Sequence, residues 1–240
     1  MSVNRSRSTG YRVARVSAIA LPLALITALA ATRQAAPTQA SILRIYLARH
    51  GETDWNTQGR IQGWTDTPLN ATGREQAAQL KTRLTGIPLD AAYSSTLSRS
   101  RETAELAYGA ARLSRLPELR ERNMGSYQGK ITSDPQIAPE YNRRRWMPDD
   151  SLDGGESLNG FEQRVGNAIA RIRREHPGGN VLVVGHGFTN QMILKQLFNL
   201  SLDQTRTITQ ANDELYLIEL QQGSAPRLWK LIVARNLTDP

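Results

Sequence analysis

Two of the three histidines in this 240-residue sequence occupy matching positions. His50 comes just after an apolar run at residues 42–48, His186 comes just after another at residues 181–184, and glycine follows each of them. Ligands of open α/β sheets bind beyond the carboxyl ends of the strands. A neutral imidazole is a competent nucleophile near neutral pH. A histidine pair in this setting predicts a catalytic site rather than two packing residues.

Arginines and glycines occur in the same kind of place. Arg49 adjoins His50, and Arg99 begins a helical turn just after a short apolar run at residues 91–94. A guanidinium group has forked donors that match phosphate oxygens, and it stays charged at any working pH. Gly51 and Gly187 would let backbone N–H groups approach an anion closely. These residue types together indicate phosphoryl chemistry.

Short apolar runs alternate with amphipathic stretches along the chain. This alternation predicts a three-layer α/β/α sandwich with a mostly parallel central sheet. The Thr-x-x-Glu spacing from Thr72 to Glu75 is that of a capping box, and it predicts the start of the first helix. Strands are expected at residues 42–48, 91–94, 181–184, 214–220 and 228–234, and helices at residues 72–86, 97–108, 156–176 and 189–198. Residues 122–155 are rich in Gly, Pro, Asp and Arg and predict a long excursion over one end of the sheet.

The N-terminal 40 residues differ in composition from the rest. Five of the 30 basic residues and none of the 22 acidic residues lie there, so the remainder carries a net charge of only +3. A domain with so mild a charge gives little reason to expect a nucleic-acid partner. An arginine-rich start, an apolar run at residues 16–31 and small residues after it are typical of an export signal. We therefore predict a leader at residues 1–40 and one domain at residues 41–240.

This leader predicts a periplasmic or secreted protein with no membrane contact beyond the export signal. Retention as an uncleaved membrane anchor stays open, because the apolar run is close to the lower limit for spanning a bilayer. The sequence contains no cysteine, so neither disulfides nor lipidated cysteines help to place the protein.

The histidines and arginines lie within a series of blocks that resembles the histidine phosphatase superfamily, the phosphoglycerate-mutase-like group. The blocks are RHGET at residues 49–53, GRIQGWTDTPL at 59–69, SSTLSRSRETA at 94–104, ELRERNMG at 118–125, GGES at 154–157 and GHG at 185–187. A bare Arg-His-Gly tripeptide would be weak support. Several blocks in the right order, spread over nearly everything from residue 42 to about residue 198, are strong support.

The resemblance implies a role for each site residue. His50 is the residue that becomes phosphorylated, and Glu121 is the proton donor to the leaving oxygen. The residues that hold the phosphoryl oxygens are Arg49, Asn56, Arg99, His186 and Gly187, with His186 charged in the transition state. Gln62 and Gly63 match the segment that lines the substrate pocket. The expected substrate is a small phosphomonoester, and neither a metal nor a cofactor is expected, since phosphoryl transfer needs mainly positioning and charge neutralisation.

Three functions compete: a phosphatase, a phosphoglycerate-type mutase, and a binding protein on a disabled scaffold. No expected catalytic residue is missing, which weakens the third. Met124 stands where the mutases resemble one another in having tyrosine, the segment between Glu121 and His186 is shorter than in mutases, and an export signal does not suit glycolysis. These features favour the phosphatase. The physiological substrate and the oligomeric state stay open.

Other conspicuous residues are assigned to surface or packing roles. His176 is expected to be a surface residue at a helix C-terminus. Arg143, Arg144 and Arg145 could meet distal acidic groups of a substrate, but a solvated charged face is the preferred interpretation. Trp64 is expected to pack rather than to contribute to recognition.

Overall fold

The computed structural model of the chain describes residues 41–231. The predicted leader and the last three residues of the strand predicted at 228–234 lie outside the described residues. Six strands form one sheet in the order β3-β2-β4-β1-β5-β6. They are β1 (Ile42–Arg49), β2 (Ala91–Ser94), β3 (Leu113–Arg115), β4 (Gly179–Gly185), β5 (Leu215–Gln221) and β6 (Arg227–Leu231). The first four run parallel, and β5 pairs antiparallel with both β1 and β6, so the predicted mostly parallel sheet is confirmed.

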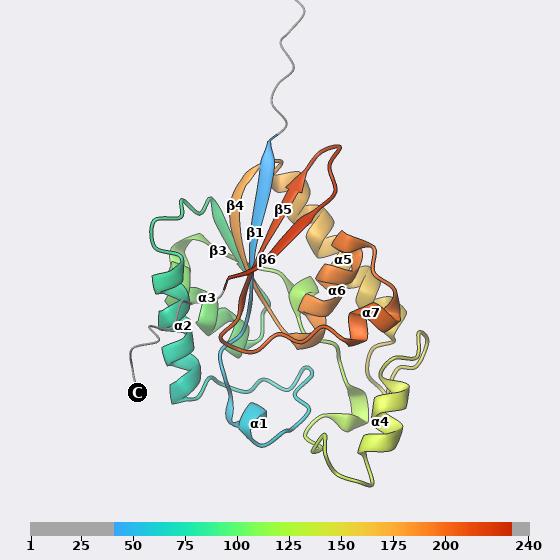
Figure 1. The fold of residues 1–240 in the computed structure, drawn as a ribbon. Helices are drawn as coiled ribbons and strands as arrows, with labels where there is room; N and C mark the ends of the chain where they lie inside the picture. The colour runs from blue at the N-terminus through green and yellow to red at the C-terminus, as the bar shows by residue number, and fades with distance from the viewer. Residues whose placement is uncertain (1–40, 232–240) are drawn as a thin grey trace, which may run out of the picture. The chain divides into compact units, whose positions relative to one another are not determined.

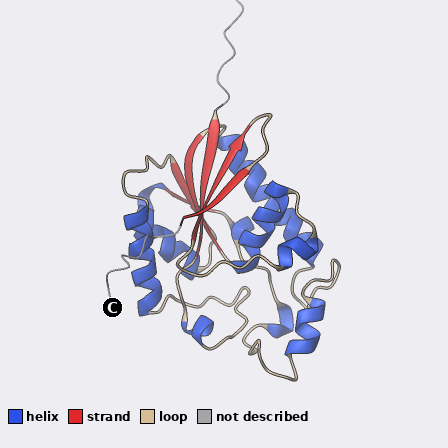
Figure 2. Ribbon diagram, viewed as in Figure 1, coloured by secondary structure: helices blue, strands red, loops and turns tan. Residues whose placement is uncertain are grey.

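Helices cover both faces of this sheet (Figures 1 and 2). One layer holds α2 (Ala71–Arg83) and α3 (Ser98–Tyr108), and the other holds α5 (Leu158–Glu175), α6 (Gly187–Phe198) and α7 (Leu202–Arg206). The sequence therefore predicted the α/β/α layers and each of the long helices. It did not predict the three-residue strand β3 or the short helices α1 (Asp54–Thr57) and α7.

The side chains of β1 show how the sheet supports two cores. Leu43, Ile45 and Leu47 belong to the cluster that includes α5 and α6, whereas Tyr46 and Ala48 belong to the cluster that includes α2 and α3. Because successive strand residues point to opposite faces, a continuous apolar run is needed when both faces are covered. This explains why most residues of the strands that lead to the two histidines are apolar on both faces, rather than alternating with polar residues.

The start of α2 differs from the prediction. The capping residue is Asn70, whose side chain accepts a hydrogen bond from the backbone N of Gly73, and not Thr72. Asn is as good an N-cap as Thr and stands three residues before Gly73, so the helix begins earlier than the Thr-x-x-Glu pattern indicated. The prediction of a capping box at Thr72 is wrong, but the prediction of a helix in this region is confirmed by α2.

The predicted excursion at residues 122–155 is irregular except for a 3₁₀ turn (Gly125–Tyr127) and helix α4 (Ala138–Arg144). It lies with α1 beyond the ends of the strands, at the bottom of Figure 1. Since α1 follows the carboxyl end of β1, the excursion covers the end of the sheet at which both strand–histidine junctions occur. This is the position at which α/β sheets bind their ligands.

Candidate active site

The register of the sheet brings the two histidines together. Strands β1 and β4 are neighbours, and Arg49 is paired with Gly185 at their carboxyl ends. His50 and His186 are the next residues of the two strands, and their ring centroids are 5.1 Å apart. Both side chains are buried, with 3% and 0% exposure. The predicted pairing of the histidines is a direct result of parallel strand alignment.

The contacts of His50 define which ring nitrogen is free. Its Nδ1 lies 2.7 Å from the carbonyl oxygen of Gly51. A carbonyl can only accept, so Nδ1 carries the proton and Nε2 keeps its lone pair. Burial, followed by the positive charges of Arg99 and Arg49, holds the pKa of His50 well below its usual value of 6.5. His50 is therefore a neutral imidazole with a free Nε2 at neutral pH.

His186 lies deeper in the same site. Its Nε2 is 2.8 Å from the hydroxyl of Ser95, the residue that follows β2. Its buried Nδ1 has no hydrogen-bond partner among the described residues. Burial and then the charge of Arg99, together with His50 and Arg49, lower its pKa well below 6.5. Ser95 lies within the SSTLSRSRETA block, but the sequence did not indicate its contact with His186. That contact arises because β2 pairs with β4.

Two guanidinium groups supply the positive charge of the site, one from the buried Arg99 and one from the half-buried Arg49. Arg99, in the first turn of α3, donates to the carbonyl oxygens of Thr65 and Gly63 at 2.9 and 2.8 Å. Arg49 donates to the carbonyl oxygen of Gln210 at 2.9 Å. Burial lowers the pKa of Arg99 to about 10, so it remains charged at neutral pH. The Nε atoms of both arginines are buried without a partner in the described part of the chain.

Carbonyl oxygens rather than carboxylates hold these arginines. No ion pair is formed by Arg49 or Arg99 within residues 41–231. Carbonyls orient a guanidinium group without neutralising its charge. The site is therefore suited to a bound anion.

Glu121, in an irregular segment after β3, lines the same cavity as His50, Arg49 and Arg99. Its carboxylate accepts hydrogen bonds from the backbone N of Arg122 at 2.9 Å, of Phe188 at 3.1 Å and of Thr189 at 3.2 Å. The last two N–H groups belong to the first turn of α6, which needs acceptors at its start. These bonds fix the carboxylate beside Gly187, at the helix end that follows His186.

The predicted residues Asn56, Gln62, Gly63 and Gly187 also line this cavity, which has a volume of about 190 Å³. Asn56 uses its Oδ1 to accept from the backbone N and the hydroxyl of Thr53, which leaves its Nδ2 group to donate elsewhere. Gln62 accepts from the hydroxyl of Thr67. Gly63 has a φ of +52°, and its carbonyl oxygen receives Arg99, so it holds the phosphate-binding candidate in place.

Gly51 has a different role from the one predicted. Its N–H donates to the Thr103 hydroxyl at 2.9 Å, so that group is already occupied. A Cβ at this position would lie 2.3 Å from the carbonyl oxygen of Gly73, which is impossibly close. Gly51 is needed for the close approach of the α2 backbone, and the prediction that it approaches an anion is wrong. At Gly187 a Cβ would meet nothing closer than 3.8 Å, from Glu121.

The three consecutive arginines separate into different environments. Arg143 is exposed, and Arg144 forms ion pairs with Asp150 and Asp153 at 2.7 and 2.8 Å. Arg145 lines the cavity, and its guanidinium lies over the ring of Tyr141 at 5.3 Å. The preferred interpretation as a solvated face is therefore wrong for Arg145. The sequence could not distinguish the three residues, because their directions depend on where α4 ends.

Two further expectations concern His176 and Trp64. His176 is the C-cap of α5, as predicted, and its Nε2 lies 2.8 Å from the Tyr93 hydroxyl. Trp64 is 38% exposed rather than packed, and its indole N–H donates to the carbonyl oxygen of Glu121 at 2.7 Å.

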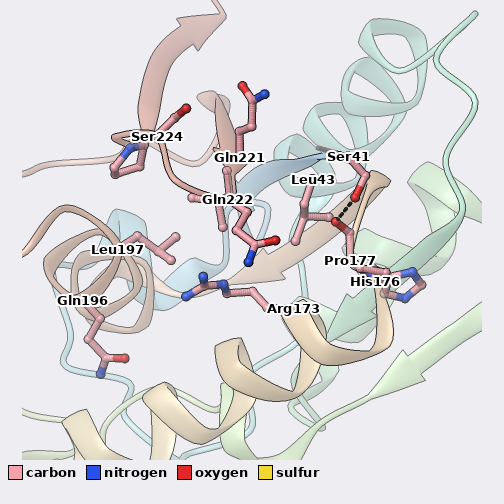
Figure 3. Close-up of a pocket in the computed structure, with 12 residues that line it drawn as sticks. Ser41, Leu43, Arg173, His176, Pro177, Gln196, Leu197, Gln221, Gln222 and Ser224 are labelled. Carbon is pink, nitrogen blue, oxygen red and sulfur yellow. Dashed lines mark hydrogen bonds between the residues drawn. The ribbon is translucent and has the colours of Figure 1, made fainter. Parts of the chain in front are cut away.

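A second cavity, of about 430 Å³, lies at the opposite end of the sheet (Figure 3). It is lined by Ser41 before β1, Pro177 before β4 and Gln221 at the end of β5. The Ser41 hydroxyl donates to the Pro177 carbonyl oxygen at 2.7 Å. This cavity contains neither of the two strand-end histidines.

Neither a membrane-spanning helix nor a metal-binding cluster is found within residues 41–231. No helix in this range is long and apolar enough to cross a membrane. No three His, Cys, Asp or Glu side chains in it lie close enough together to hold a metal ion.

Comparison with known proteins identifies the family. The sequence profile of the histidine phosphatase superfamily (branch 1) matches residues 45–231, and the chain belongs to this superfamily. A curated protein named probable phosphoglycerate mutase GpmB, from Escherichia fergusonii, is 34% identical over 188 residues, which make up 76% of this chain and 87% of that protein. The predicted family is confirmed.

Solved structures agree with this assignment. Bacillus stearothermophilus YhfR has a TM-score of 0.69 and 32% identity, over 76% of this chain and 93% of that chain. The alpha-ribazole phosphatase from Shigella flexneri has a TM-score of 0.68 and 28% identity, over 78% of this chain and 95% of that chain. The predicted fold class is confirmed, whereas the boundary at residue 41 stays a prediction because the profile match begins within β1.

The lowered pKa values of His50 and His186 predict an unusual titration. We expect the imidazole ¹⁵N signals of both residues in the folded protein to keep their neutral values while pH falls through 6.5. The unfolded chain takes up these protons near pH 6.5, so the free energy of unfolding should fall as pH drops below that value. Inorganic phosphate should raise both pKa values, because its charge offsets that of the arginines. Signals that titrate at or above pH 6.5 without phosphate would contradict this account.

Proposed function

We propose that the protein is a phosphomonoester hydrolase that transfers a phosphoryl group first to Nε2 of His50 and then to water. The observation that carries this proposal is the state of His50. Its ring is oriented by the Gly51 carbonyl, kept neutral by burial and by two arginines, and lines the cavity with a free Nε2. A nucleophile held in this form needs no further activation at neutral pH.

The surrounding charges support phosphoryl transfer to this nitrogen. Arg49 and Arg99 are fixed by carbonyl oxygens, so they are preorganised for the three equatorial oxygens of the transferring group. Asn56 adds a neutral donor, and Gly187 lies at the start of α6, where backbone N–H groups favour an anion. His186, once a phosphoryl group offsets the arginine charges, can take up a proton and donate to an oxygen of that group.

Glu121 is the group that handles protons in this scheme. In the first step Nε2 of His50 attacks phosphorus, the bond from phosphorus to the leaving oxygen breaks, and Glu121 gives its proton to that oxygen. In the second step the Glu121 carboxylate takes a proton from water, the resulting oxygen attacks phosphorus, and the bond between phosphorus and Nε2 breaks. Phosphate leaves, and His50 and Glu121 regain their starting states.

A phosphoglycerate-type mutase is the second candidate, because a relative with 34% identity is named a probable phosphoglycerate mutase. The alpha-ribazole phosphatase from Shigella flexneri, at 28% identity, favours hydrolysis instead. Met124, buried on the cavity, and the short link between Glu121 and His186 also favour hydrolysis. Release of phosphate from a panel of phosphomonoesters, assayed beside phosphoglycerate isomerisation, separates the two. Isomerisation that outpaces phosphate release would favour the mutase.

We further propose that residues 1–40 direct the protein out of the cytoplasm, with retention as a membrane anchor as the alternative. The support is the arginine-rich, acid-free start and the apolar run that follows it. N-terminal sequencing of protein from its native host should find a start near residue 31 or residue 41 in an extracytoplasmic fraction. Intact Met1 on a cytosolic protein would refute the proposal, and intact Met1 in the membrane fraction would favour the anchor.

Activity is predicted to require no divalent metal. The positive charge that phosphoryl transfer needs is supplied by Arg49 and Arg99. Dialysis against a chelator should therefore leave kcat and KM unchanged, with added magnesium or zinc as the control. A loss of activity that either metal restores would contradict the proposed mechanism.

The central prediction is a phosphoenzyme on His50. Rapid quenching with ³²P-labelled substrate should trap label that is labile in acid and stable in base, as expected for a phosphorus–nitrogen bond. His50→Ala should abolish both the label and turnover, whereas His176→Ala should keep both, because that imidazole lies at the opposite end of β4. Label that persists in His50→Ala would exclude His50 as the acceptor.

Glu121→Gln should separate substrates by their leaving groups. An alkoxide needs a proton as its bond to phosphorus breaks, so the variant should slow hydrolysis of an alkyl phosphate by roughly 100-fold. Nitrophenolate leaves without this help, so nitrophenyl phosphate should still phosphorylate His50 in a burst, followed by slow release. An equal loss with both substrates and no accumulated phosphoenzyme would show that another group is the acid.

A further inference from the structure

The GGES block at residues 154–157 has a clear local role only for its serine. The Ser157 side chain caps α5 by accepting from the backbone N of Gly160 at 3.1 Å. Glu156 instead forms a two-pronged ion pair with Arg164, two turns along α5, at 2.8 Å to Nε and 2.7 Å to Nη2. Both side chains are only 18% exposed, so solvent screens this pair less than a surface pair.

Arg164 uses its remaining donors on the segment that carries Glu121. Nη1 donates to the carbonyl oxygens of Glu118 and Arg120 at 2.7 and 3.1 Å, and Nη2 donates to that of Glu121 at 3.3 Å. After the 3₁₀ turn Pro117–Leu119 the chain forms no helix or strand until residue 125. These carbonyl oxygens therefore depend on side chains for partners, and one guanidinium group serves three of them.

The same segment is tied to the GGES block through the backbone. The N–H of Glu156 donates to the carbonyl oxygen of Asn123 at 3.0 Å, and Arg122 Nε donates to the carbonyl oxygen of Glu156 at 2.8 Å. A Cβ at Gly155 would lie 2.4 Å from the Asn123 carbonyl oxygen, so the two backbones pack as closely as glycine allows. The block and the Glu121 segment form one unit.

We propose that Arg164, oriented by Glu156, is the positioning residue that holds the Glu121 carboxyl at the cavity. The inference rests on the proposed role of Glu121 as proton donor. The carboxyl is fixed at one end by the first turn of α6, and its backbone is held at the other end by Arg164, with the Trp64 indole N–H as a further donor to the Glu121 carbonyl oxygen. Proton transfer depends on sub-ångström placement, so loss of the second anchor should impair the acid more than the nucleophile.

Arg164→Lys tests this, because an ammonium group cannot reproduce a planar fork that contacts a carboxylate and three carbonyls. We expect kcat for an alkyl phosphate to fall by about 10-fold or more with KM unchanged, since the lost contact acts on the proton donor. The burst in which nitrophenyl phosphate phosphorylates His50 should stay close to the wild-type rate. Arg171→Lys is the matched control, because Arg171 pairs with Glu175 on the same helix and forms no hydrogen bond or ion pair with residues 118–125.

A double variant shows whether Arg164 acts through Glu121. If it does, Arg164→Lys should have little further effect on alkyl phosphate hydrolysis in the Glu121→Gln background, because the group it positions is already disabled. Should Arg164→Lys fail to fold, Glu156→Gln, which keeps one acceptor oxygen for Arg164, should show the same leaving-group pattern in weaker form.

Two results would overturn the inference. One is an equal loss with alkyl and aryl substrates, and the other is a loss in the double variant equal to the product of the single losses. Either would leave the proposed function intact as long as wild-type His50 carries the label. A wild-type protein that carries no label on His50 would instead refute the proposed function, and this inference with it.

Discussion

The rest of the site depends on one constraint, which is that two guanidinium charges, from the buried Arg99 and the half-buried Arg49, lie together without a bonded carboxylate. Desolvation of a charge is costly unless other groups compensate, and here carbonyl oxygens of Gly63, Thr65 and Gln210 provide partial compensation. The two histidines stay neutral, because burial disfavours their charged forms and because a third and a fourth positive charge in the same space would be unfavourable. One arrangement therefore favours a bound anion and keeps His50, the proposed nucleophile, neutral.

The sheet is what makes this crowding possible. Strands β1, β4 and β2 lie side by side and end at the same level, so the residues after them converge without any long loop. His50, His186 and Ser95 are each the first residue beyond a strand end, and the strand pairing continues up to the residue before each of them. Gly51, next to His50, permits the close approach of the α2 backbone at Gly73.

How far the sequence predicts this structure follows from the range of the interactions involved. Strand ends and long helices are set by local apolar patterns, so the α/β/α layers and the pairing of His50 with His186 could be predicted. Gly51 could not be interpreted correctly, because its partner Gly73 is distant in the sequence and the clash is visible only in three dimensions. The position of Arg145 could not be predicted for a similar reason. The three consecutive arginines have the same local pattern, and they differ only in the direction in which each side chain points at the end of α4.

Main-chain hydrogen bonds position the phosphoryl end of the proposed site, whereas side-chain hydrogen bonds position its leaving-group end. Groups for the phosphoryl end come largely from strand ends and from the first turns of α3 and α6, where main-chain hydrogen bonds set their positions. The proposed leaving-group end comes from α4 and from irregular segments at residues 120–124 and 145–157, which depend on side-chain donors such as Arg122 and Arg164. Irregular segments tolerate change better than ladder-bonded strands. Under the proposed function, substitutions there can therefore alter which phosphate ester fits, while the histidine and the arginines assigned to the phosphoryl chemistry stay in place.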